Sequence, residues 1–159
     1  MDSEWKVFEK LARRTHELNI KKSKETAHEE LHPFEQRNIH PKIDHVTRRL
    51  FDDGHYSQAT FEAFKFLDKQ VQSLSLNKES GYKLMMQAFS ETSPQIKLTD
   101  LSNTSEIDEQ IGYKFIFSGS VLAIRNPRGH EVLFPETIGE CLDHISLASM
   151  LVRRLNNIK

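Results

Sequence analysis

An unbroken stripe of apolar residues at helical spacing runs through the C-terminal part of the chain. Apolar residues three and four positions apart share one face of an α-helix, so the stripe predicts a long amphipathic helix packed on a core. Thr137 and Glu140 have the spacing of a capping box, which predicts that this helix begins directly after Thr137. The stripe consists of Ile138, Cys141, Leu142, Ile145, Ala148, Leu151, Val152 and Leu155.

Two earlier apolar patterns predict two more helices, separated at Gly54. The first begins at Pro41, a residue type suited to the first turn of a helix. The second, residues 56–74, has one clear apolar face, but Phe61 and Phe66 lie well off that face. A helix that is apolar on more than one side must be buried on more than one side. We therefore expect it to be either the central helix of a bundle or part of a contact between subunits.

The region ahead of the C-terminal helix divides into a loop and a helix. Residues 91–105 are polar, acidic and rich in turn formers, which predicts an exposed loop with a short strand at Ile96 to Leu98. Residues 109–124 also suit a strand locally, but their length favours a helix, with Thr104 or Ser105 as its cap.

The composition is typical of a helix-rich globular protein. The 159 residues include 37% apolar and 28% charged side chains with only 6 Gly and 5 Pro, unlike a disordered chain or a β-sandwich. This length fits one all-α domain. Because Pro33 and Pro41 disfavour helix in the residues before them, we expect a boundary there. Residues 1–39 would be a charged helical extension or docking arm, and residues 40–159 the helical bundle.

The sequence argues against several classes of protein. It has no apolar stretch near the ~20 residues of a membrane span and a charged start unlike a signal peptide, so we expect a cytoplasmic protein without membrane contact. Cys141 is the only cysteine, and we expect it in the core. The pairs His28/His32 and His40/His45 lack a third ligand, so we predict neither a metal site nor a cofactor.

The net charge of −1 conceals an uneven distribution. Residues 91–113 are acidic, whereas the chain around Lys114, Arg125 and Arg128 is basic. The overall balance argues against a protein that coats nucleic acid without specificity. Any contact with a polyanion must therefore be focused on a small basic region.

That basic region is centred on the sequence RNPRGH, residues 125–130, between two predicted helices. The Asn-Pro step is expected to end one helix and start another, and Gly129 to free the backbone, so that the turn aims Arg125 and His130 to the same side. Arginine offers a permanent charge and a planar fork for phosphate, and histidine exchanges protons near neutrality. Together they can perform phosphodiester chemistry without a metal ion.

The same six residues resemble the Arg-Asn-x-x-x-His signature of HEPN domains. The wider run over residues 40–157, including YKFIFSGSVLAIRNPRGH and ECLDHISLASMLVRRL, is similar to the Ymh family, a HEPN-like group of unknown function. The resemblance implies a helical bundle that dimerises and places two Arg/His pairs in one cleft. It also implies an endoribonuclease of toxin or phage-defence (abortive infection) systems.

The resemblance further implies a metal-independent cleavage in which the RNA 2′-hydroxyl attacks the adjacent phosphorus. Arg125 would hold the phosphate and the charge developing on it, Asn126 would orient the pair, and His130 would move the proton. An antitoxin or a sensor protein is expected as a further partner.

Two other interpretations stay open. One is a non-catalytic HEPN-like module that binds RNA, a nucleotide or a partner protein, and the other is a purely structural helical protein. Under the enzyme interpretation, Arg128 is expected to bind the RNA substrate. His55 and Tyr56, at the start of the central helix, are expected to line the same cleft.

Overall fold

The computed structural model describes residues 5–15, 31–131 and 134–158, and every regular element in those ranges is a helix. The all-α prediction is confirmed. The chain divides into two compact units, residues 1–32 and 33–159. The first unit contains a helix over residues 5–15, on which the Trp5 and Phe8 rings stack 5.8 Å apart. No helix in the described ranges is both long enough and apolar enough to cross a membrane.

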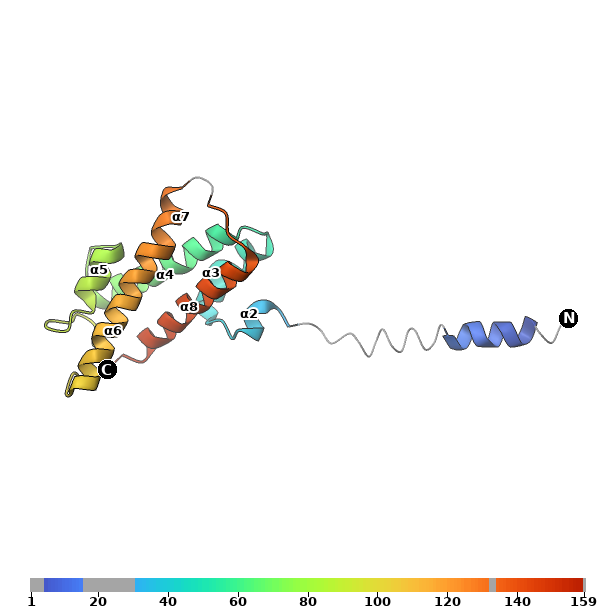
Figure 1. The fold of residues 1–159 in the computed structure, drawn as a ribbon, viewed down its shortest axis with the longest axis horizontal. Coiled ribbons are helices and arrows are strands. Elements are labelled where there is room, and N and C mark those ends of the chain that lie inside the picture. Colours follow the sequence, from blue (N-terminus) through green and yellow to red (C-terminus); the bar gives the residue numbers. More distant parts are fainter. Residues whose placement is uncertain (1–4, 16–30, 132–133, 159) are drawn as a thin grey trace. The chain divides into compact units, whose positions relative to one another are not determined.

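The second unit is a bundle arranged around one central helix (Figure 1). Its elements are α2 (Pro33–Gln36), α3 (Pro41–Asp52), α4 (Tyr56–Ser75), α5 (Gly81–Ala88), α6 (Thr104–Ser120), the π-helical turn η1 (Val121–Arg125), α7 (Asn126–His130) and α8 (Ile138–Asn156). α3, α5, η1, α7 and α8 all contact α4. Of the two expected roles of this helix, the structure shows the central position in the bundle.

The core lies where α4, α6 and α8 meet. Its largest fully buried side chains include Phe64 and Leu67 of α4, Phe117 of α6 and Ile145 of α8. Each such burial stabilises the fold by about 1.5–3 kcal/mol relative to an exposed side chain. Phe66, which lies off the main apolar face of α4, is half-buried and packs against this core.

Local signals set several helix ends as predicted. Thr137 and Glu140 form a complete capping box at the start of α8. Pro41 is the first residue of α3, where the side chain of His40 accepts a hydrogen bond from the Lys42 amide. Gly54 follows the end of α3 with a φ of 78°, a backbone conformation that glycine adopts at little cost.

Two local predictions are wrong. The cap of α6 is Asn103, whose side chain accepts from the Glu106 amide, because Thr104 is already the first helical residue. Ile96 to Leu98 form no strand, because the buried Gln110 side chain bonds their backbone instead. Gln110 accepts from the Leu98 amide at 2.9 Å and donates to the Ile96 carbonyl at 3.0 Å.

The second unit begins ahead of residue 40, where the domain was predicted to start. Phe34 of α2 is 1% exposed, and its ring lies 4.9 Å from that of Phe51. Ile39 is also buried. Residues 33–39 therefore contribute side chains to the core of the bundle.

Candidate functional site

The RNPRGH sequence does not break the helix before it. α6 passes through η1 into α7 with helical backbone throughout, and Figure 1 shows the three as one continuous rod. The Asn126 amide donates to the Val121 carbonyl, five residues back. Pro127 lacks an amide hydrogen and clashes with a regular α-helical turn, and the wider π turn accommodates it. The predicted turn at residues 125–130 is therefore wrong.

The residues that were predicted to be catalytic line one small cavity. Arg125, Asn126 and His130, together with Gly129 and Phe61 of α4, enclose a space of about 150 Å³. Arg125 is the last residue of η1, and His130 is the last residue of α7. The π turn thus sets the direction in which Arg125 enters the cavity.

The Arg125 guanidinium is only weakly bound by the protein. Its Nε is buried and has no hydrogen-bond partner among the described residues. One terminal nitrogen donates a long bond, 3.4 Å, to the Asn126 side-chain oxygen, and the guanidinium carbon lies 5.8 Å from the centre of the Phe61 ring. A buried donor without a partner costs about 1–3 kcal/mol. The guanidinium thus borders the cavity without a carboxylate partner among the described residues.

Gly129 has a different role from the one predicted. Its backbone is helical, so it provides no special conformational freedom. A Cβ atom at this position would instead lie 3.0 Å from the Phe61 ring. Any larger residue would crowd the Phe61 ring, so glycine favours the close approach of α7 to Phe61, which lines the cavity.

His130 and Asn126 differ in how they are held. His130 is exposed at the end of α7, and no hydrogen bond to a described residue fixes its ring. The side chain of Asn126 contacts Arg125. The structure thus gives Asn126 a link to one member of the Arg125/His130 pair.

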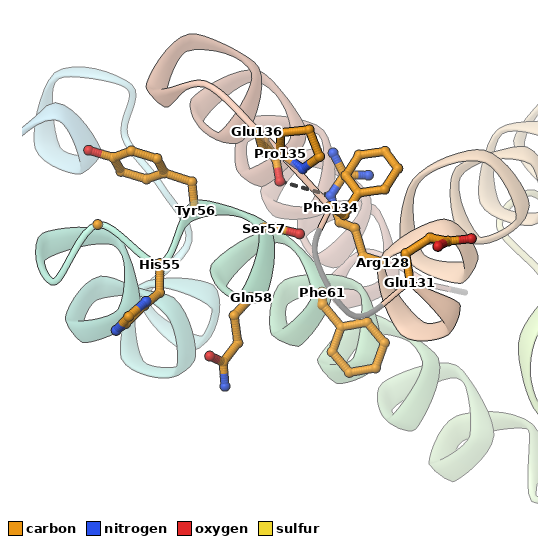
Figure 2. A pocket seen from close by; sticks show the side chains of 11 residues that line it. His55, Tyr56, Ser57, Gln58, Phe61, Arg128, Glu131, Phe134, Pro135 and Glu136 are labelled. Carbon is orange, nitrogen blue, oxygen red and sulfur yellow. Dashed lines mark hydrogen bonds and ion pairs between the residues drawn. The ribbon is translucent and has the colours of Figure 1, made fainter.

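A second, larger cavity, of about 540 Å³, is also lined by Phe61 (Figure 2). His55 and Tyr56, which were predicted to share a cleft with Arg125, line this second cavity. The Tyr56 ring packs 5.4 Å from that of Phe51, and Figure 2 shows it pointing away from Phe61. Phe61 lines both cavities, so the predicted site residues fall into two adjoining spaces with one shared wall.

Arg128 also borders the larger cavity, but its guanidinium is already occupied (Figure 2). It pairs with Glu136 at 2.8 Å, donates to the Ile124 carbonyl at 2.7 Å and lies over the Phe134 ring at 4.6 Å. Arg128 was expected to bind substrate, but its guanidinium already has partners within the protein.

Glu136 joins this ion pair to α4 and α8. It accepts from the Thr60 hydroxyl at 2.9 Å and lies 2.6 Å from the His144 Nδ1. Sequence reasoning missed Glu136, His144 and Thr60. No motif marks them, because Thr60 of α4 is 76 residues from Glu136 in the sequence.

Cys141 is a core residue, as the sequence predicted. It is fully buried, and its thiol donates to the Tyr56 carbonyl at 3.3 Å. Burial raises the pKa of the Cys141 thiol to about 11, which disfavours the thiolate needed for nucleophilic attack.

Of the histidines that were weighed as metal ligands, His28 lies outside the described residues. No group of three potential metal ligands occurs within the described ranges.

The two cavities offer different chemistry. The smaller one combines a histidine with a permanent cation that has no carboxylate partner in the part of the chain that the structure describes. This combination suits an anion whose reaction needs proton transfer. The larger one has aromatic and polar walls, and its arginine is neutralised by Glu136. A ligand with a phosphate and a flat uncharged part would match both.

Comparison with known protein families gives a match over most of the chain. Residues 37–155 match a family described as "Protein of unknown function (Hypoth_ymh)". No curated protein matches the chain, and no solved structure matches it. The matched residues include every residue that lines the two cavities.

Proposed function

The chain belongs to the Hypoth_Ymh family, and we propose that it is a metal-independent endoribonuclease with a HEPN-like bundle, of toxin or phage-defence (abortive infection) type. One observation carries the proposal. The half-buried Arg125 keeps a buried Nε without a partner among the described residues, in the same cavity as His130. This is the arrangement that a phosphodiester with a mobile proton requires.

In the proposed reaction the RNA 2′-oxygen attacks the adjacent phosphorus. His130 accepts the proton that leaves the 2′-hydroxyl and donates it to the departing 5′-oxygen as the P–O5′ bond breaks. Arg125 binds the phosphate and stabilises the additional negative charge of the transition state. Asn126 orients Arg125 through its side-chain oxygen. The products are a 2′,3′-cyclic phosphate and a 5′-hydroxyl.

We further propose that the protein acts as a homodimer through the exposed face of α6 and η1. Phe115 and Leu122 are 57% and 53% exposed, although both are large and apolar. The open space around Gly112 and Gly119 leaves room for a second helix to approach. This stripe consists of Gly112, Phe115, Ile116, Gly119, Leu122 and Ala123.

A second copy of the chain is the proposed occupant, because a two-fold axis brings the same stripe of each subunit together. The stripe ends three residues before Asn126. A dimer formed there would bring the two small cavities toward each other. The sequence-based argument from Phe61 and Phe66 is weaker, because both side chains are half-buried within the bundle.

The helix over residues 5–15 is proposed to dock a partner, either an antitoxin or a sensor protein. It exposes Trp5, Phe8 and Leu11 and carries four basic residues against one acidic residue. An apolar, basic helix fits an acidic protein surface with an apolar groove. The cytoplasm, where RNA is abundant, is the proposed location.

One observation favours a second candidate, a non-catalytic module that binds RNA, a nucleotide or a partner protein. No third group among the described residues orients the exposed His130 ring. Many acid–base sites hold the histidine with such a group. Under this alternative the cavity binds a phosphate of the RNA, and the RNA is not cut.

The test is cleavage of a mixed RNA pool by the purified protein in EDTA, followed by analysis of the product ends. The nuclease predicts cut RNA with 2′,3′-cyclic phosphate ends. Binding without cutting favours the module. Cutting that chelator abolishes contradicts the proposed mechanism.

A further inference from the structure

We infer that the larger cavity is a nucleobase subsite that selects bases with an exocyclic amino group, and that Glu131 reads this group. The inference rests on the proposed action on RNA and goes beyond it by naming the specificity of the site. It depends on the walls of the cavity, the charges around it and the polar groups left open in it.

The first observation is a pair of aromatic side chains from separate elements. Phe61 of α4 and Phe134, which lies between α7 and α8, both line the cavity (Figure 2). The Phe134 ring is held in place by Arg128, whose guanidinium carbon lies 4.6 Å from the ring centre. Single-stranded RNA is commonly bound by stacking of an unpaired base on an aromatic side chain.

The second observation is that, among the described residues that line this cavity, the one permanent cation, Arg128, is already paired. The Arg128 and Glu136 side chains are 5% and 1% exposed and neutralise each other. The exposed Glu131 at the end of α7 adds a negative charge. A carboxylate at this edge repels phosphate, so the cavity suits the uncharged base of a nucleotide.

The third observation is the set of polar groups that remain open. The side chains of Ser57, Gln58 and Glu131 line the cavity and have no hydrogen-bond partner among the described residues. A carboxylate only accepts hydrogen bonds. Adenine, cytosine and guanine each offer an exocyclic amino donor, and uracil does not. The single donor of uracil, its N3–H, lies between two carbonyl oxygens that repel a carboxylate, so Glu131 favours the first three bases over uracil.

The two cavities are placed to hold one nucleotide. Phe61 lines both of them. Along η1 and α7, Arg125, Asn126, Gly129 and His130 line the small cavity, whereas Arg128 and Glu131 line the large one. A phosphate beside Arg125 thus leaves its base on the Glu131 side of Phe61.

The experiment compares the wild type with Glu131→Gln, which keeps the size of the side chain and removes its charge. Asp108→Asn, an exposed site on α6 that borders neither cavity, is the matched control. Bases flanking each cut in a mixed RNA pool are counted by end sequencing. Binding is measured by fluorescence anisotropy with 2′-O-methyl hexamers of A, C or U, which cannot undergo 2′-oxygen attack.

The wild type and Asp108→Asn are expected to favour amino-bearing bases over uracil by roughly 5- to 100-fold, the range of one good base contact. Glu131→Gln is expected to bring this ratio close to one while its melting temperature stays unchanged. RNA that is cut without base preference, or with a preference that survives Glu131→Gln, overturns the subsite and leaves the nuclease standing. If the protein discriminates between the hexamers but never cuts RNA, the result supports the subsite and contradicts the proposed nuclease activity. A protein that neither cuts nor binds overturns both.

Discussion

Arg128 and Glu136 form an ion pair of 2.8 Å in which the two side chains are 5% and 1% exposed. The pair ties the end of the α6–η1–α7 rod to the residue just ahead of the α8 capping box. The Thr60 hydroxyl donates a further hydrogen bond to Glu136, and Arg128 donates one to the Ile124 carbonyl. The region that was predicted to be a polar turn outside the core therefore contains a buried charged network.

Breaking this pair should destabilise the bundle. Arg128→Ala leaves the Glu136 carboxylate buried without its partner, which costs about 3–5 kcal/mol of unfolding free energy. The double variant Arg128→Met/Glu136→Leu removes both charges and should recover much of that loss. Urea unfolding measures both effects, with Arg49→Ala, whose side chain is 95% exposed, as a control expected within about 0.5 kcal/mol. Equal losses in the single and double variants would contradict this account.

The parts of the fold that depend on local chemistry were predictable from the sequence. The capping box of α8 and Pro41 at the start of α3 act through residues within one turn. The central position of α4 followed from apolar residues on more than one side of that helix. These signals need no knowledge of what lies across the core.

The candidate site was predictable only as a cluster of residue types. Pro127 was taken to end a helix, yet the rod continues because a π turn lets the Val121 carbonyl accept from Asn126. The need for Gly129 arises from Phe61, which is distant in the sequence. Such contacts between remote segments leave no local pattern, so neither the two cavities nor the Glu136 network could be predicted.

The N-terminal unit should be removable only up to His32. A chain that begins at Pro33 keeps Phe34, which is 1% exposed, and should unfold at the same urea concentration as the full chain. A chain that begins at Asn38 loses Phe34 and should be less stable by about 3–5 kcal/mol, as for removal of a buried phenylalanine. Equal stability of the two truncated chains would show that α2 contributes little.

The exposed stripe on α6 and η1 should control the oligomeric state. Phe115→Glu places a charge in the proposed subunit contact and should shift a dimer to monomers of 18.5 kDa at micromolar concentration. Met150→Glu changes another exposed apolar residue, on α8, and should leave the dimer intact. Sedimentation velocity separates the two states. A wild type that sediments only as a monomer would rule out the proposed dimer.

His40 should make the stability of the bundle depend on pH. Burial lowers the pKa of His40, and the nearby Arg153 and Lys42 lower it further. The folded state thus binds fewer protons than the unfolded state, whose histidine pKa is near 6.5. Stability is complete above that value and is lost as the pH falls through it toward the folded pKa. His40→Asn keeps a capping side chain without the titration, so its unfolding free energy should fall less from about pH 7.5 to about pH 5. Equal pH dependence in both proteins would exclude His40 as the cause.

Arg125 and His130 should affect RNA cleavage in different ways, because they contribute to different parts of one barrier. His130→Ala removes proton transfer and should lower the rate by about 10²–10⁴-fold while RNA affinity stays nearly unchanged. Arg125→Ala removes a charge from the phosphate and should lower both rate and affinity. Its loss of affinity should shrink at high salt, where the electrostatic attraction is screened.

Single-turnover cleavage and anisotropy binding at two salt concentrations separate these effects, and Arg49→Ala, an exposed arginine on α3, is the matched control. Neither site variant should unfold at markedly lower urea, because Arg125 has no ion-pair partner among the described residues and His130 is exposed. If both variants cut RNA as fast as the wild type, the Arg125/His130 nuclease fails and the binding module replaces it.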